Sequence, residues 1–212
     1  ILPMGANFGD LDNDGYPDFY LGTGDPDYAT LMPSLMYLNK KGHGFADVTT
    51  AGGFGHMQKG HGIAFVDIDH DGDTDVFAQM GGHFRGDAAH DALYENPGFG
   101  NHWITIKLVG VQSNRSAIGS HIRVQVKQNG HARSIYRHVN SGGSFGASSL
   151  RQTIGLGKAD RIDTLQVFWP TTGQTQTFRD VAMDDAIQIV EGEDTYTRLH
   201  LQRIHLGGRP GQ

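Results

Sequence analysis

The sequence predicts an all-β protein in which two propeller-type blades precede a small β-sandwich-like domain. Three observations support this fold class. The 31 glycines separate many short runs of β-branched and aromatic residues, no long segment places apolar residues three and four apart, and the first hundred residues contain an internal repeat. A chain of 212 residues can hold one large domain or two modest ones, each with its own core.

The repeat has an offset of 57 residues. GANFGDLDNDGYPDFYLGTG (5–24) aligns without a gap with GIAFVDIDHDGDTDVFAQMG (62–81), and MYLN (36–39) aligns at the same offset with LYEN (93–96). Because the register persists through a variable connection, we interpret the two segments as one structural unit used twice. Each reads as strand, acidic loop, strand, long connection, strand, and FADVT (45–49) adds a fourth strand to the first.

Four short antiparallel strands are typical of a propeller blade, so we expect two four-stranded blades in residues 1–100. Two blades do not close a propeller, which needs about four. Further blades are expected from a longer parent protein or from other chains, or else the strand edges stay exposed. The chain opens on Ile1 without an initiator Met, which favours a processed or trimmed piece of something longer.

The pattern changes after residue 100. Strand-like runs such as HWITIKLVG, SHIRVQVKQNG and DTLQVFWPTTG follow one another between Gly, Asn, Asp and Pro turns. We expect a second, smaller β domain over residues 101–192, with Trp103 and Trp169 in its core. The segment 140–149 reads as a flexible loop, and residues 193–212 as a partly ordered tail with one strand or short helix around 199–206.

The two acidic loops share the pattern D-x-D-x-D-G-x-x-D, in which carboxylates at positions one, three, five and nine can turn inward around a tight glycine turn. The carbonyl of position seven completes an all-oxygen shell of the kind that suits Ca²⁺, and Mg²⁺ is the weaker candidate. Two calcium sites are therefore predicted. Their ligands would be Asp10, Asp12, Asp14, Tyr16 and Asp18 in the first loop, and Asp67, Asp69, Asp71, Asp73 and Asp75 in the second.

Two other interpretations of the loops were weighed. An EF-hand needs a glutamate at position twelve and flanking helices, whereas this chain has Leu21 and Ala78 there and strand-like flanks. A plain solvated hairpin would also be rich in Asp and Gly. The recurrence of the same Asp and Gly positions in both repeats favours metal binding over that alternative.

Charge and composition exclude several classes of function and site. Nine of the 23 acidic residues lie in the two loops, so the formal charge of −6 is local, and two divalent cations would reduce it to −2. Nothing indicates a nucleic-acid surface. The chain has no cysteine, hence no disulfide or thiolate site. No apolar run reaches ~20 residues, so no transmembrane segment is expected.

The two repeats resemble FG-GAP repeats, also called VCBS repeats. The segment NHWITIKLVGVQSNRSAIGSHIRVQV (101–126), with IGLGKADRIDTLQVFWPTTGQTQTF (154–178), is similar to the ASPIC/UnbV domain that follows such repeats in cartilage acidic protein-like chains. The resemblance covers roughly residues 4–192. It implies a β-propeller, calcium held by the first, third, fifth and ninth positions of each loop, and no established catalytic residue in the second domain.

We therefore expect a secreted, calcium-stabilised binding or scaffolding protein, structural or adhesive in role, and not an enzyme. Exposed blade edges favour self-assembly into a fibre, with other copies, further blades, an extracellular protein or a glycan as partners. The alternative is a hydrolase, lyase or glycan-binding module. It would use a His/Asp-lined site in the second repeat, drawn from His56, His61, His83, Asp87, His90 and Asp91.

Overall fold

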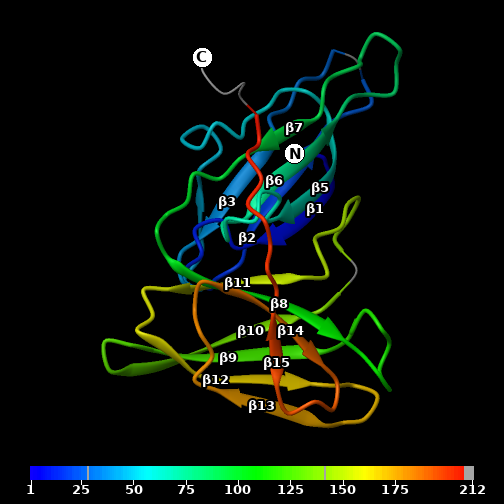
Figure 1. Ribbon diagram of the computed structural model, residues 1–212. Coiled ribbons are helices and arrows are strands. Elements are labelled where there is room, and N and C mark those ends of the chain that lie inside the picture. The colour runs from blue at the N-terminus through cyan, green and yellow to red at the C-terminus, as the bar shows by residue number, and fades with distance from the viewer. Residues whose placement is uncertain (28, 141, 208–212) are drawn as a thin grey trace.

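The computed structural model describes residues 1–27, 29–140 and 142–207. This part of the chain contains fifteen strands and no helix, which confirms the all-β fold class. The strands form four sheets, two in the blade region and two in a sandwich that follows it (Figure 1). Residues 102–198 supply the sandwich strands, and the predicted division near residue 100 falls just before the first of them.

The first blade is a four-stranded antiparallel sheet of β1 (Pro3–Gly9), β2 (Asp18–Thr23), β3 (Leu35–Asn39) and β4 (Phe45–Asp47), in that order. The second blade contains β5 (Gly60–Val66), β6 (Asp75–Met80) and β7 (Ala92–Tyr94). It therefore has three strands where four were expected. The chain leaves β7 for the sandwich through Pro97, which cannot donate a ladder hydrogen bond.

The two blades pack face to face around one apolar cluster. Tyr20 and Met36 of the first blade are fully buried against Ile63, Val76 and Ala78 of the second, and all five belong to the same core. Glycines in β1 and β2 let the sheets approach closely. A Cβ at Gly9, for example, would lie 2.1 Å from the ring of Phe65.

The sandwich has a separate and larger core. Its first sheet contains β10 (His131–His138), β9 (His121–Gln128), β12 (Arg161–Phe168) and β13 (Thr175–Arg179) in spatial order. The second contains β11 (Gln152–Gly157), β8 (His102–Val109), β14 (Asp185–Val190) and β15 (Tyr196–Arg198), with β8 and β14 parallel. Trp169 is fully buried in this core, as predicted.

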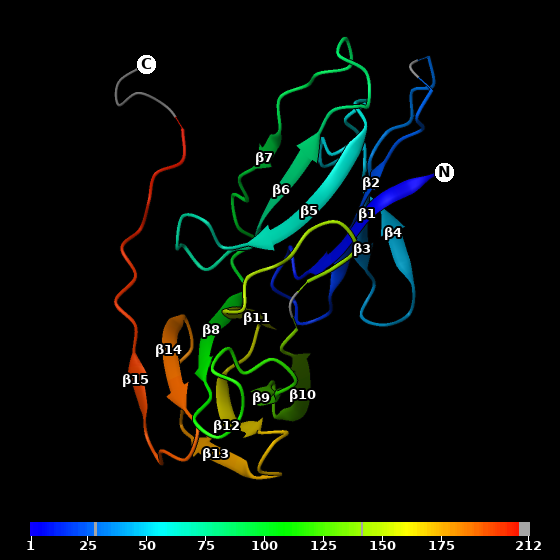
Figure 2. The ribbon, with the colours of Figure 1, turned by 90° about the vertical axis from the view of Figure 1, so that its right-hand side faces the viewer.

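The loop between β10 and β11 joins the sandwich to both blades. Ala6 and Ser144 exchange two backbone hydrogen bonds of 3.1 Å, and the amide of Ile63 donates to the carbonyl of Phe145 at 2.9 Å. Figure 2 shows this yellow-green loop lying across β5 and β1. The described residues of 140–149 form a loop, as expected, and they cover the inner edges of two sheets. Residue 141 lies outside the described part.

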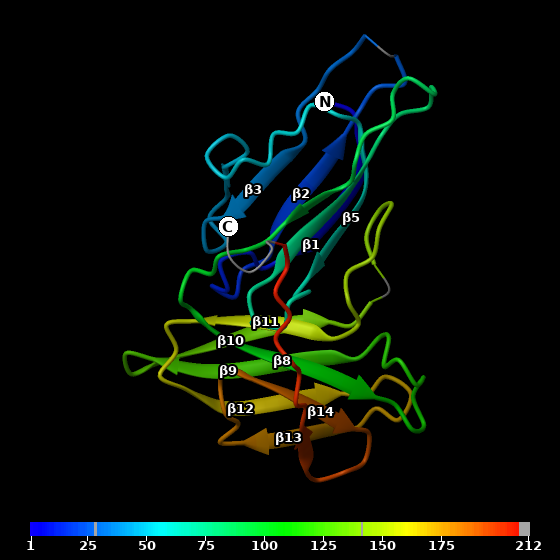
Figure 3. The ribbon, with the colours of Figure 1, turned by 45° about the horizontal axis from the view of Figure 1, so that its top comes forward.

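The C-terminal segment leaves the sandwich and returns to the second blade (Figures 2 and 3). Its strand is β15, which pairs with β14, so the predicted strand or helix around 199–206 is not found there. The amide of Ile204 donates to the carbonyl of Asp69 at 2.7 Å. The tail thus reaches the second acidic loop, and its last predicted residues, 208–212, lie outside the described part.

Candidate metal centres

The two acidic loops have the same backbone shape. Each connects two antiparallel strands, β1 to β2 and β5 to β6. The fourth position is left-handed in both, with φ of 54° at Asn13 and 63° at His70, and the glycine at the sixth position has φ of 93° at Gly15 and 92° at Gly72. A left-handed pair of this kind reverses the chain tightly, and glycine adopts it without steric cost. The sequence repeat is therefore a structural repeat at these loops.

The ninth-position aspartate is fixed in the same way in both loops. Asp18 accepts hydrogen bonds of 2.7 Å from the amides of Leu11 and Asn39. Asp75 accepts equivalent bonds of 3.0 and 2.8 Å from the amides 57 residues later, those of Ile68 and Asn96. Since both oxygens of each carboxylate are used, these aspartates close the loop and also tie it to Asn39 at the end of β3 or to Asn96, two residues after β7.

Each loop gathers three carboxylates closely enough to share one ion. In each group the ligand oxygens all lie within 4.8 Å of one another. The first group is Asp10, Asp12 and Asp18, and the second is Asp67, Asp69 and Asp71. A cleft of ≈ 550 Å³ between the blades and the sandwich is lined by both first-position aspartates, Asp10 and Asp67.

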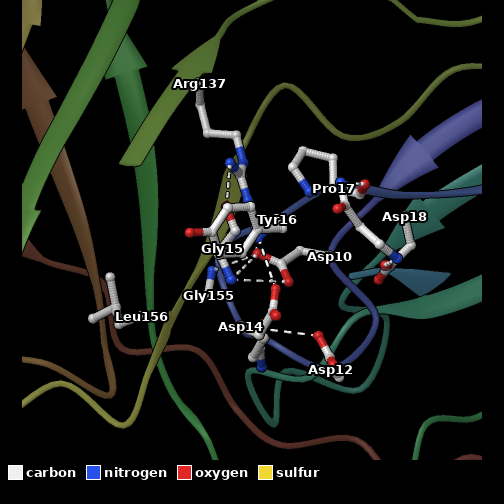
Figure 4. A network of polar contacts seen from close by, with 12 residues as sticks. Asp10, Asp12, Asp14, Gly15, Tyr16, Pro17, Asp18, Arg137, Gly155 and Leu156 are labelled. Carbon is white, nitrogen blue, oxygen red and sulfur yellow. Dashed lines mark hydrogen bonds and ion pairs between the residues drawn. The ribbon is translucent and has the colours of Figure 1, made fainter. Parts of the chain in front are cut away.

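The first loop is also held by the sandwich (Figure 4). Arg137 of β10 lies 2.7 Å from the Asp10 carboxylate, and the side chains of this ion pair are only 13% and 2% exposed. The amides of Gly15 and Gly155 donate to the same Asp10 oxygen at 3.0 and 3.2 Å. Arg133 donates to the Asp14 carbonyl at 2.7 Å. The loop is therefore a joint between two domains as well as a group of carboxylates.

Crowding and burial perturb these carboxylates. Burial raises the pKa of Asp10 to about 6, although Arg137 opposes the shift, and burial raises the pKa of Asp18 to about 7. The pKa values of Asp12, Asp67 and Asp75 are also raised, in each case mainly by burial. Charged carboxylates in such a place are unfavourable without a compensating positive charge. The arginine supplies only one such charge to the first loop.

The donor set fits a hard divalent cation. Every candidate donor is an oxygen, the carboxylates converge from a single short loop, and buried negative charge exceeds the positive charge beside it. Acidic clusters in these two loops can thus hold a metal ion. Once bound, such an ion would neutralise the carboxylates and fix the turn between the two strands.

The remaining predicted ligands lie around these groups. Asp14 accepts a hydrogen bond of 2.8 Å from the Tyr16 amide, and Asp75 makes the two bonds described above. Neither belongs to a three-carboxylate group. The carboxylate of Asp73 accepts a 2.9 Å bond from Asn13 rather than turning into its loop. Burial raises the pKa of Asp73 to about 6. The carbonyl ligands at Tyr16 and Asp73 stay predictions.

Two residues proved more important than their patterns indicated. Asn13, at the fourth position of the first loop, is fully buried, and its amide donates to the carbonyl of Gly72 and to Asp73 at 3.0 and 2.9 Å. It thus bridges the two loops. Trp103, expected in the core, is half-buried instead, and its indole packs so closely on Gly72 that a Cβ there would lie 1.9 Å away. The sequence alone does not show that Asn13 is buried or that it contacts the second acidic loop.

The histidines of the second repeat do not form a comparable group. Among the described residues, three or more potential ligand atoms converge only in the two acidic loops. Asp87 forms a buried ion pair with Lys59, and Asp91 accepts a 3.0 Å bond from the Met80 amide. His83 packs its ring against Phe84. These contacts give the polar groups structural partners.

Comparison with known families covers both halves of the chain. The FG-GAP-like repeat model matches residues 10–78, a range that includes both acidic loops, and the ASPIC and UnbV model matches residues 110–195. No curated protein sequence matches the chain significantly. In the part of the chain that the structure describes, no helix is long and apolar enough to cross a membrane. The chain is therefore an FG-GAP-like repeat protein with an ASPIC and UnbV domain.

Proposed function

We propose that the chain is a calcium-stabilised binding and scaffolding module of the extracellular space or cell surface, with one Ca²⁺ in each acidic loop. The observation that carries this proposal is the repetition of one loop, with its left-handed fourth position, its glycine and its doubly bonded ninth aspartate. FG-GAP repeats commonly bind calcium and are typical of extracellular proteins, which supports both the ion and the location.

Calcium would act as a structural clamp. In the absence of an ion, each loop holds buried carboxylates that repel one another, and this repulsion opposes the closure of the blade. A bound divalent cation attracts the same carboxylates, so the loop then favours the closure of the blade. At extracellular millimolar calcium, a site with a Kd of ~10⁻⁴ M is mostly filled, so modest affinity is sufficient for this role.

The role assigned to the module is non-catalytic. Asp87 and Asp91 of the second repeat contact structural partners, and among the described residues the His/Asp candidates do not converge as the loop carboxylates do. Its partners are proposed to be other copies of the chain, further propeller blades, or an extracellular protein or glycan. A hydrolase, lyase or glycan-binding module with a His/Asp site would need those side chains to rearrange.

Calorimetry and thermal unfolding test the clamp. Titration of the metal-free chain with CaCl₂ should show two ions per chain, and calcium should raise the melting temperature relative to chelator. Asp69→Asn should bind one ion and lose part of that gain. The matched control is Asp194→Asn, an exposed aspartate outside both loops. Equal melting temperatures of the unmodified chain with calcium and with chelator would refute the proposal.

A further inference from the structure

The described tail residues, 199–207, lie against the second acidic loop. The amide of Ile204 donates to the carbonyl of Asp69 at 2.7 Å, and Nδ1 of His70 lies 2.9 Å from the carbonyl of Gln202. Figure 2 shows this red segment passing beside the loop that connects β5 to β6. The tail therefore follows the loop at its third and fourth positions.

Between these two contacts, a cation of the tail reaches the fifth position of the loop. Arg203 pairs with Oδ2 of Asp71 at 2.8 Å, and the side chains are 62% and 11% exposed. The other oxygen of Asp71, Oδ1, accepts a 2.9 Å hydrogen bond from the amide of Asp73. Oδ2 is therefore the oxygen that Asp71 can offer to an ion, and Arg203 is bound to it.

The first loop also has an arginine, but that arginine is fixed in place. Arg137 lies in β10, is paired with Asp10 and donates to the carbonyl of Tyr136 at 3.0 Å. Each three-carboxylate group thus contains one aspartate that is paired with a guanidinium. Only the second guanidinium is carried by a segment outside the strands, whose residues 202–205 are all exposed.

We propose that Arg203 is an internal competitor of Ca²⁺ in the second loop, so that a bound ion displaces the guanidinium and releases the tail from the blade. This inference rests on the proposed function, in which each loop binds one ion. A divalent cation on Asp71 would take the oxygen that Arg203 uses and would repel the guanidinium. The tail would then keep only the hydrogen bonds of Gln202 and Ile204, on a segment that water reaches.

Competition of this kind is reciprocal. If calcium weakens the attachment of the tail, the tail weakens calcium binding by the same factor. The exposure of the Arg203 ion pair limits that factor to about fivefold, which corresponds to ~1 kcal/mol. The second loop therefore binds calcium more weakly than its carboxylates alone would, and the position of the tail depends on whether this loop is filled.

Hydrogen exchange of the full chain, measured by mass spectrometry, tests the release. Addition of CaCl₂ should increase exchange about fivefold in the peptide that contains the Ile204 amide, and should slow exchange in β5 and β6. Asp69→Asn keeps the backbone carbonyl but removes a carboxylate of the second group, so it should abolish the increase. Asp12→Asn, in the first group, should retain it. Near-ultraviolet circular dichroism checks that both variants are folded.

Calorimetry with CaCl₂ measures the reciprocal effect. Arg203→Met should tighten one of the two calcium sites about fivefold and leave the other unchanged. Arg203→Lys keeps the positive charge and should stay close to the unmodified chain. The matched control is Arg198→Met, because Arg198 is 61% exposed and pairs at 2.7 Å with Asp185, outside both loops. Its calcium affinities should equal those of the unmodified chain.

The outcomes distinguish this inference from the proposed function. Two bound ions with unchanged exchange at Ile204, or unchanged affinities in Arg203→Met, would overturn the competition and leave the calcium clamp intact. Slower exchange at Ile204 in calcium would mean that the tail closes over the filled loop, which also overturns it. A chain that binds no calcium would refute the proposed function and this inference together.

Discussion

Arg137 of the sandwich and Asp10 of the first acidic loop form an ion pair of 2.7 Å that is almost entirely buried. Their positions differ by 127 residues, so the pair joins the two domains at the same point where a metal ion would bind. The neighbouring amide of Gly155 donates to the same carboxylate at 3.2 Å. A change in the charge of this loop is thereby transmitted to the domain interface.

Arg137→Met should destabilise the protein by about 3 kcal/mol, because it leaves the buried Asp10 carboxylate without its partner. The loss should be smaller with calcium, since the ion supplies positive charge to the same loop. Urea unfolding with and without CaCl₂ measures both values. Arg203→Met is the matched control, because Arg203 contacts Asp71 at 2.8 Å but is 62% exposed, and its loss should cost less than about 1 kcal/mol. Equal effects of the two changes would contradict the assignment of Arg137.

Without calcium, stability should fall as pH rises. The folded pKa values of Asp10 and Asp18, about 6 and about 7, lie above the ordinary value of 3.8, so the folded state binds more protons in this window. The loss of folding stability caused by ionising these carboxylates is absent below about pH 4 and complete above about pH 7. Melting temperatures in chelator should therefore drop across this range, while the gain from calcium grows. A calcium gain that is largest at pH 5 would contradict this account.

Glu191→Gln should destabilise the sandwich by roughly 2 kcal/mol at pH 7, because charge-assisted hydrogen bonds are lost. One Glu191 oxygen accepts bonds of 2.8, 2.8 and 2.7 Å from the amides of Val111, Gln112 and Ser113. These bonds lower the pKa of Glu191 to about 2 against the opposing effect of burial. The contribution is present above pH 4.5 and lost as pH falls towards 2, which acid unfolding of both proteins will show. A matching change in calcium affinity is not expected, so an altered calcium titration would argue against a purely local role.

Gly9→Ala should weaken the packing of the two blades. The new methyl carbon would lie 2.1 Å from the Phe65 ring, and overpacking of this kind typically costs about 1–3 kcal/mol. Gly55→Ala is the control, because its nearest neighbour, the Thr49 methyl, would lie 3.2 Å away and can adjust. Thermal unfolding compares the two. An unchanged melting temperature of Gly9→Ala would mean that the sheets of the two blades can separate slightly at little cost, which would contradict the close packing of the blades at Gly9.

The features that could be predicted from the sequence are those that recur locally in the two repeats. The offset of 57 residues located both loops, and the paired strands β1–β2 and β5–β6 follow directly from alternation and turn residues. What it could not predict depends on contacts across many residues. The segment 142–149 has the composition of a linker, yet it pairs with β1 at Ala6, more than a hundred residues away in the sequence. Asn13 and Arg137 likewise gain their roles only from neighbours in other elements.

The returning C-terminal segment is tied to the second acidic loop through Arg203 and Ile204. A mechanical load that pulls on this segment would not act first on the sandwich. It would detach the tail from the second blade by breaking the Ile204 hydrogen bond and the Arg203 ion pair one after another. Contacts loaded in sequence yield at low force, so the tail would stretch before either domain unfolds.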